Sequence, residues 1–212
     1  MQDSKPSAEA FADRPARGRP RDPGLEARVF DAAMEIYAAG GWPALTFDAV
    51  SRQAGVGKAG LYRRWATRSD LLRETLEARW YAVGAIDTGD LRGDLLAVAQ
   101  MCFDGLSGPY GGVTLHLRAD ALRFKDFRET AAPYSAGQVA QGRSIVRRAI
   151  TRGELSADVN PGLVMDLVVG AVTNHVASTP KRLRPNMIAR KESFIVGLID
   201  TVLRGLSAHD PT

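Results

Sequence analysis

One stretch of the chain concentrates side chains that could bind phosphates or the edges of nucleic-acid bases. No acidic residue lies between Asp48 and Asp70, although the whole chain carries 24 acidic and 28 basic residues. The same stretch holds five basic residues, namely Arg52, Lys58, Arg63, Arg64 and Arg68. Arginine can donate two parallel hydrogen bonds to a guanine edge or a phosphate, and lysine neutralises phosphate charge. This basic window therefore indicates a polyanionic partner, which a net charge of +4 alone would not.

The residues that usually carry enzymatic chemistry are few and scattered. Cys102 is the single cysteine, which excludes an internal disulfide and any metal site built from paired cysteines. The histidines His116, His175 and His209 lie far apart and lack zinc-protease spacing. The sequence GVGKAG at 55–60 matches a dinucleotide-binding pattern, but that pattern requires a preceding hydrophobic strand, and a polar amphipathic segment precedes it here. We therefore predict no enzyme, no metal site and no cofactor.

Length and composition favour one or two folded domains. The chain has 212 residues, of which 45% are hydrophobic and 25% charged, as is usual for globular proteins. The most apolar run, residues 163–172, is shorter than a membrane helix and contains Asp166, which could face solvent, a pocket or a partner subunit. The first residues have no apolar secretion signal. We expect a soluble, cytoplasmic protein with no membrane partner.

Hydrophobic spacing predicts an all-α fold with about nine helices, because no segment sustains the alternation of a strand. Residues 1–21 contain three prolines and little apolar content, which predicts a disordered basic arm. Residues 22–83 contain four short helical patterns, and we expect them to form an N-terminal domain. Residues 84–212 should form a second domain, because their helical patterns are longer and include 133–152, 161–178 and 185–206.

The basic window coincides with a helix, a glycine turn and a second helix. Thr46 can cap the first helix, and Gly55 supplies the backbone freedom that the turn needs. The second helix, residues 58–65, would turn Leu61 and Trp65 inward. In a helix-turn-helix the first helix braces the second, whose N-terminal residues enter the major groove of DNA. The segment therefore predicts a DNA-binding unit.

At this point a family resemblance is clear. The stretch TFDAVSRQAGVGKAGLYRRWATRSDLL, residues 46–72, resembles the DNA-binding domain of TetR-family transcriptional repressors. The positions that match the family pattern are Thr46, Ala54, Gly55, Val56, Leu61, Tyr62 and Leu71. Gly57 departs from it, because the family usually has Ser or Thr there, and Arg64 stands where the family usually has His. Gly57 offers no hydroxyl to cap the recognition helix.

The resemblance implies two sets of DNA contacts. Lys58, Gly60 and Arg63 take the base-facing positions, and Arg63 is the candidate for a bidentate contact with guanine. Contacts with phosphates are implied for Thr46, Tyr62, Arg64 and Arg68. In the arm, Arg19 and Arg21 either enter an adjacent minor groove or belong to a solubilising tail.

For the C-terminal helices the resemblance implies a ligand-binding and dimerisation domain. The run from Arg148 to Leu155, followed by Val159-Asn160-Pro161, resembles one branch of such domains. Our candidates for an effector pocket are Trp80, Met101, Phe103, His116, Phe124, Phe127 and Asn174. Our candidates for a dimer interface form the apolar stripe of the last helix, Ile188, Ile195, Ile199, Val202 and Leu206.

These observations predict a homodimeric transcriptional regulator that binds a pseudopalindromic operator in double-stranded DNA. We expect a repressor that a small hydrophobic or amphipathic effector releases from DNA. One alternative is a low-specificity architectural DNA-binding protein, which its affinity ratio against random DNA would identify. The other is an all-α enzyme, which turnover tied to His116 or His175 would identify. The sequence does not distinguish repression from activation.

Overall fold

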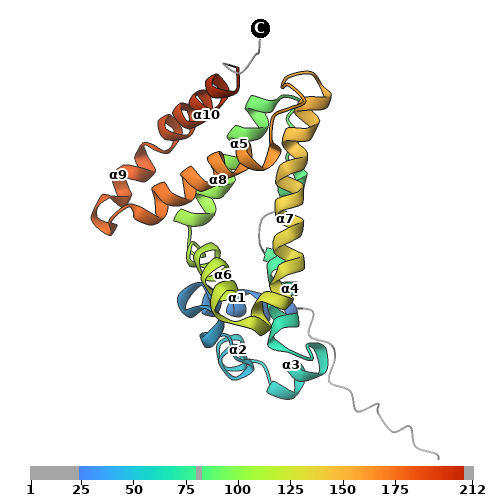
Figure 1. Cartoon of the computed structure of the whole chain (residues 1–212). Coiled ribbons are helices and arrows are strands. Elements are labelled where there is room, and N and C mark those ends of the chain that lie inside the picture. The colour runs from blue at the N-terminus through green and yellow to red at the C-terminus, as the bar shows by residue number, and fades with distance from the viewer. Residues whose placement is uncertain (1–23, 80–82, 208–212) are drawn as a thin grey trace, which may run out of the picture.

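A computed structural model describes residues 24–79 and 83–207, and within these ranges all regular elements are helical (Figure 1). The helices are α1 (Leu25–Ala44), α2 (Phe47–Ala54), α3 (Lys58–Arg64), α4 (Arg68–Arg79), η1 (Val83–Ala85), α5 (Leu91–Ser107), α6 (Gly112–Arg123), α7 (Lys125–Thr151), α8 (Pro161–Ser178), η2 (Lys181–Leu183), α9 (Arg184–Ala189) and α10 (Lys191–Ser207). The all-α prediction is confirmed. Ten α-helices and two 3₁₀-helices lie in the described ranges, where about nine helices were expected.

Helices α1–α4 share one core with α6 and the first turns of α7 (Figure 1). Phe127 of α7 is buried there, with its ring 5.0 Å from that of Trp42 and 6.1 Å from that of Tyr37. Val113 of α6 belongs to the same core. The core of the N-terminal helices therefore extends beyond the predicted division at 83/84, because α6 and α7 contribute residues to it.

A buried carboxylate ties α6 to a sharp bend in α1. Gly41 has a φ of +63°, and a Cβ at this position would come within 2.8 Å of the Asp120 carboxylate. Asp120 Oδ2 accepts hydrogen bonds from the backbone N–H of Trp42 at 2.8 Å and the hydroxyl of Tyr37 at 3.1 Å. Burial and the Asp120 charge raise the pKa of Tyr37, so its hydroxyl stays protonated and donates. The bend at Gly41 therefore brings α1 close enough to α6 for these hydrogen bonds with Asp120 to form.

The second core lies at the other end of the molecule, between α5, the upper half of α7, α8 and α10. Ile195 and Ile199 are 3% and 0% exposed, and Val202 is also buried in this core. We expected these residues in a dimer interface, on the argument that one chain offers them no partner. That argument is wrong, because α10 packs its apolar stripe onto α5 and α8 of its own chain.

Two helices differ in extent from the sequence prediction. The helix expected at 133–152 begins earlier, at Lys125, and continues through Pro133, because Phe127 anchors its first turns in the first core. The helix expected at 185–206 is interrupted at Arg190, which separates α9 from α10.

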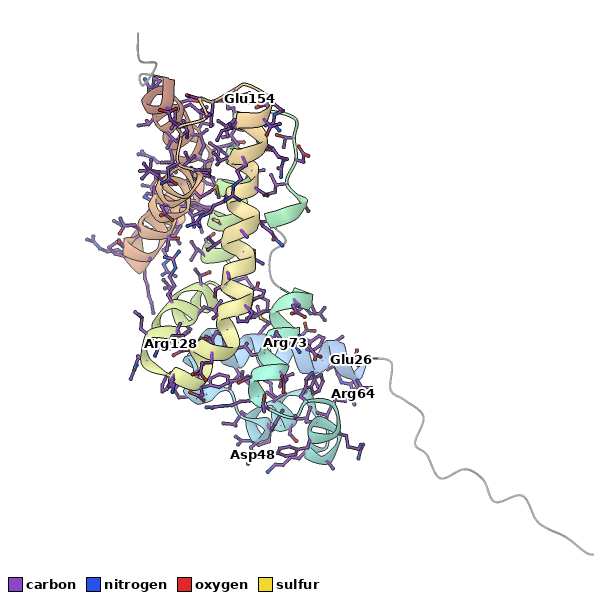
Figure 2. The ribbon with its side chains drawn as sticks, turned by 45° about the vertical axis from the view of Figure 1, so that its right-hand side comes forward. Glu26, Asp48, Arg64, Arg73, Arg128 and Glu154 are labelled. Carbon is purple, nitrogen blue, oxygen red and sulfur yellow. The ribbon has the colours of Figure 1, made fainter. Side chains whose placement is uncertain are left out.

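The motif at residues 148–155 serves as a structural clamp. Arg148 and Arg152 approach the fully buried Asp94 carboxylate at 3.6 and 3.7 Å. Glu154 accepts a hydrogen bond from the backbone N–H of Leu91, the first residue of α5, at 2.6 Å. The motif therefore fixes the end of α7 to the start of α5 at the top of the molecule, where Figure 2 labels Glu154. A buried carboxylate requires such partners to offset its desolvation.

Candidate DNA-binding surface and ligand cavity

Short-range hydrogen bonds stabilise the first helix and the turn of the helix-turn-helix. Thr46 caps α2, with its hydroxyl oxygen accepting from the backbone N–H of Ala49 at 3.1 Å. Gly55 then takes the left-handed conformation, with a φ of +65°. Ser51 donates from its hydroxyl to the carbonyl of Val56 at 2.6 Å. The predicted roles of Thr46 as a cap and Gly55 as the turn are confirmed.

Helix α3 turns its basic side chains outward. Leu61 and Trp65 are buried, as predicted, and Lys58, Tyr62, Arg63 and Arg64 are exposed. Lys58 forms an ion pair with Asp48 at 2.6 Å, and Arg64 pairs with Glu26, as the adjacent labels in Figure 2 show. Tyr62 is 59% exposed, with the edge of its ring against Phe47. Within the described part of the chain, Arg63 has no side-chain partner, so its guanidinium is available.

The N-terminus of α3 lacks a side-chain cap. Gly57 occupies the cap position with a φ of −70°, and no side chain accepts a hydrogen bond from the first turn. This confirms the consequence expected from a glycine in place of the usual hydroxyl residue. Gly60 is half-buried on the same helix, beside Arg63.

Arg68 is engaged with its own chain. Its guanidinium carbon lies 3.8 Å from the ring centre of Trp42, and its Nη1 donates to the Trp42 carbonyl at 3.1 Å. A longer ion pair, at 3.9 Å, joins it to Asp126 at the start of α7. The phosphate contact that the family resemblance implies would have to compete with these contacts. The other two basic candidates, Arg19 and Arg21, lie outside the described residues.

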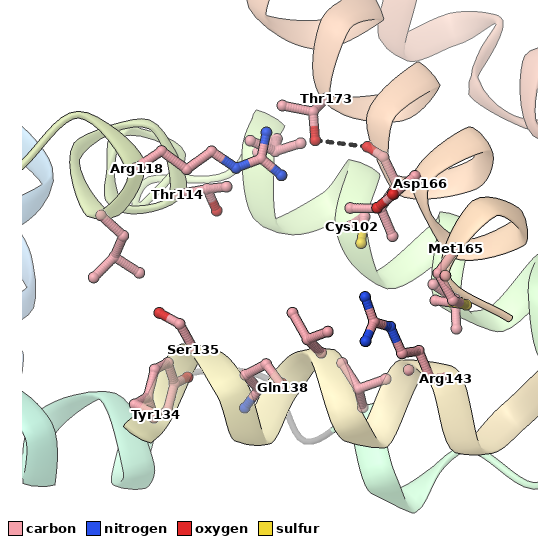
Figure 3. Close-up of a pocket in the computed structure, with 18 residues that line it drawn as sticks. Cys102, Thr114, Arg118, Tyr134, Ser135, Gln138, Arg143, Met165, Asp166 and Thr173 are labelled. Carbon is pink, nitrogen blue, oxygen red and sulfur yellow. Dashed lines mark hydrogen bonds between the residues drawn. The ribbon is translucent and has the colours of Figure 1, made fainter. Parts of the chain in front are cut away.

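A cavity of about 330 Å³ lies between α5, α6, α7 and α8 (Figure 3). Its lining consists of Val83, Val98, Cys102, Leu106, Thr114, Leu117, Arg118, Tyr134, Ser135, Gln138, Val139, Gly142, Arg143, Gly162, Met165, Asp166, Val169 and Thr173. The volume is at the lower end of the range for small-molecule sites. Asp166, for which the sequence left three environments open, is in this lining.

None of the described pocket candidates lines this cavity. Phe103 and Phe127 are buried in the two cores, because large aromatic side chains gain most from complete removal from water. The other described candidates lie elsewhere on the fold: Met101 is half-buried on α5, His116 packs against Tyr37, Phe124 lies against the first core, and Asn174 is exposed on α8. Trp80 lies outside the described residues.

The cavity residues that the sequence analysis missed recur at helical spacing. On α7 they are Ser135, Gln138, Val139 and Gly142, and on α8 they are Gly162, Val169 and Thr173, which lie on the same face as Asp166. Each set mixes small, polar and apolar residues on one helix face. That mixture is the signal in the sequence for these positions, whereas aromatic side chains mark the two cores.

Two titratable groups in the lining are neutral at physiological pH. Burial raises the pKa of the Cys102 thiol to about 11, although the positive charge of Arg118 acts in the opposite direction. Burial likewise raises the pKa of the Tyr134 hydroxyl to about 12. The charged groups of the lining are therefore Arg118, Arg143 and Asp166.

An exposed apolar face lies on α8, away from the cavity. Leu163 and Leu167 are 58% and 47% exposed, and Gly170 continues the same face. On α10, Val196 and Gly197 are also exposed. Among the earlier interface candidates, Ile188 is exposed and Leu206 is half-buried.

Among the described residues, no helix is both long and apolar enough to cross a bilayer. They also contain no cluster of three or more His, Cys, Asp or Glu side chains that could hold a metal ion.

Two family models match the chain. Residues 29–75 match the model of the bacterial regulatory proteins of the tetR family. Residues 85–191 match the tetracycline-repressor-like C-terminal domain. The two matches cover the helix-turn-helix and the four helices that enclose the cavity.

The chain is also similar to individual transcriptional regulators. The chain is 24% identical over 198 residues to the HTH-type transcriptional regulator YdeS of Bacillus subtilis, covering 92% of this chain and 96% of that protein. It is 28% identical over 168 residues to the DNA-binding transcriptional repressor TetR of Mycobacteroides abscessus, covering 76% and 84%. The crystal structure of the TetR-family regulator SCO0332 is 27% identical with a TM-score of 0.60, covering 86% of this chain and 98% of that one.

Proposed function

The chain belongs to the TetR family of bacterial transcriptional regulators, and from this we propose that it is a homodimeric repressor released from its operator by a small ligand. The observation that carries the proposal is the outward face of α3, the second helix of the helix-turn-helix. Lys58, Tyr62 and Arg63 are exposed on this face, and the Ser51 hydrogen bond to Val56 holds the turn before it. A short helix of this kind fits the major groove. We infer no enzymatic activity, and a protein that acts on operator DNA would work in the bacterial cytoplasm.

We propose that each side chain of the surface has a separate role. Arg63 reads a base edge, since its guanidinium forms no hydrogen bond or ion pair with any residue that the structure describes. Thr46 and Tyr62 donate to phosphates from their hydroxyls, because the Thr46 cap uses only the acceptor capacity of its oxygen. Lys58 and Arg64 would exchange their partners Asp48 and Glu26 for DNA. Such exposed ion pairs are weak, so the exchange costs little.

We propose that dimerisation uses the exposed face of α8, with Leu163, Leu167 and Gly170, together with Val196 and Gly197 of α10. A two-fold contact between such helix pairs gives a four-helix bundle. The two-fold axis would relate the two α3 helices, so that each can enter one half-site of a pseudopalindromic operator.

We propose that α6 transmits ligand binding to the DNA-binding surface. Thr114, Leu117 and Arg118 line the cavity, while Asp120 of the same helix is bonded to Trp42 and Tyr37 of α1. A ligand that favours another position of α6 would therefore change the spacing of the two α3 helices. Release requires that the ligand bind this second state more tightly than the DNA-bound one.

The test is selection of bound duplexes from a random pool, followed by titration of wild type and Arg63→Ala on the selected and random DNA. Wild type should prefer the selected sequence by about a thousandfold or more. Arg63→Ala should lose about 1–3 kcal/mol of operator binding and relax one symmetric base position. Arg147→Ala on the exposed upper part of α7 is the control and should bind as wild type does.

A wild-type protein that binds random and selected DNA equally would overturn the repressor proposal and favour an architectural role. Unchanged base preference in Arg63→Ala would show that α3 does not present this residue to a base edge.

A further inference from the structure

The cavity carries two arginines whose guanidinium groups have no hydrogen-bond or ion-pair partner among the described residues. Arg118 enters from α6 and Arg143 from α7, and Figure 3 shows both guanidinium groups extending from their helices toward the space below α8. Within the described residues, neither guanidinium has a hydrogen bond or ion pair. By contrast, Arg148, one turn beyond Arg143 on α7, contacts the Asp94 carboxylate and donates to the carbonyl of Ile86. The two cavity arginines are thus available to a ligand.

The charge of the lining favours an anion. Among the described residues of the lining, Asp166 is the one carboxylate, so two arginines and one aspartate leave a net charge of +1. Cys102 and Tyr134 do not reduce this charge, because their pKa values of about 11 and 12 keep them neutral at physiological pH. Arginine binds carboxylates with two parallel hydrogen bonds, and two arginines from different helices can approach one head group from two directions.

The rest of the cavity suits an apolar body. Val98 and Leu106 of α5 are buried at the inner wall, and Met165 and Val169 of α8 extend the apolar surface. Both arginines are exposed, so the charge lies at the rim and the apolar surface lies inside. A ligand that satisfies both parts must carry an anionic head on an apolar body.

We propose that the cavity binds a single-chain organic anion, with its carboxylate between Arg118 and Arg143 and its apolar body against α5 and α8. That this anion is the effector rests on the proposed function, whereas the ligand class rests on the cavity. The sequence-based expectation of a hydrophobic or amphipathic ligand is thereby narrowed to an amphipathic anion.

The probes are straight-chain carboxylates from octanoate to hexadecanoate, with 1-decanol and decyltrimethylammonium as neutral and cationic matches for decanoate. Binding to the full-length protein is measured by calorimetry. It is measured again as protection of Cys102, the single cysteine, from alkylation at pH 9. We expect one or more carboxylates to bind and protect Cys102, with decanol and the cation at least about tenfold weaker than decanoate.

Arg118→Gln and Arg143→Gln should each weaken carboxylate binding about tenfold or more, because each removes a charge-assisted hydrogen bond. Arg147→Gln, an exposed arginine outside the lining, is the matched control and should bind as wild type does. Circular dichroism checks that each variant is folded.

The proposal is overturned if no carboxylate protects Cys102, if decanol or the cation binds as tightly as decanoate, or if both glutamine variants keep wild-type affinity. Operator release is measured separately. Arginine-dependent carboxylate binding that leaves operator affinity unchanged would support the ligand class and contradict the repressor mechanism.

Discussion

Arg68 joins three elements at the base of the molecule. It stacks on Trp42 of α1, donates to the Trp42 carbonyl and approaches Asp126 of α7. Its side chain is 35% exposed, so only part of each contact is removed from water. We therefore assign Arg68 mainly to the joint between the DNA-binding helices and α7.

Arg68→Ala should lower the free energy of unfolding by about 1–3 kcal/mol, because it removes a cation–π contact and a charge-assisted hydrogen bond. Urea denaturation of the purified protein measures this loss. Arg68→Lys, which keeps the charge but not the planar fork, should retain part of the stability. An unchanged unfolding midpoint, with weaker binding to all DNA, would instead support a phosphate contact.

The Cys102 thiol should react slowly in the native protein. Burial raises its pKa from 9.0 to about 11, and the thiolate is the reactive form. At pH 8 the native protein should hold roughly a hundredth of the thiolate present in the unfolded chain. The native alkylation rate should rise about tenfold per pH unit from 7 to 10, whereas the unfolded rate should level off near pH 9. Parallel pH curves in native and unfolded protein would contradict this assignment.

Among the elements, α3 is a short helix whose first turn has no side-chain cap. Gly55 and Gly57 both precede it, and a Cβ at either position would meet no atom within 4 Å. Their backbones differ, since Gly57 has a φ of −70° and Gly55 a φ of +65°. A serine at position 57 would therefore test capping of α3, whereas a serine at position 55 would test backbone strain.

Gly57→Ser should stabilise the protein by about 0.5–1 kcal/mol, because it adds a cap and reduces the entropy of the unfolded chain. Gly55→Ser should destabilise it by about 1 kcal/mol, because a side chain disfavours the left-handed conformation. Thermal unfolding of the two variants and of wild type measures whether each substitution raises or lowers the stability. Equal effects of the two substitutions would show that α3 does not start as described.

At the scale of the whole molecule, two apolar stripes on the last helices serve different purposes. Ile199 is fully buried in its own chain, whereas Leu167 on α8 is 47% exposed. An exposed apolar face of this kind marks an interaction surface. The dimer proposed above places Leu167, and not Ile199, between the two subunits.

Leu167→Glu should therefore give a folded monomer with weak operator binding, because a single half-site loses the contacts of the second subunit. Ile199→Glu should lower the free energy of unfolding by about 4 kcal/mol or more, because it buries an unpaired charge. Sedimentation and circular dichroism distinguish the two outcomes. A dimeric Leu167→Glu protein would place the interface elsewhere.

Local patterns in the sequence were sufficient for the helical class and the DNA-binding unit. The cap at Thr46 and the turn at Gly55 follow from contacts within a few residues, which residue type specifies directly. The spacing of Leu61 and Trp65 indicates which face of α3 is buried, as the structure shows. The absence of a cap at Gly57 followed in the same way.

Only the tertiary structure decided which surface covers each apolar stripe and where the cavity lies. The spacing of Ile195 and Ile199 shows that one face of the helix is buried, but not whether its own chain or a second copy buries it. Arg118 and Arg143 are 25 positions apart, and neither departs from an ordinary helix pattern. They share a cavity because α6 and α7 face each other below α8, and this long-range packing has no local signature.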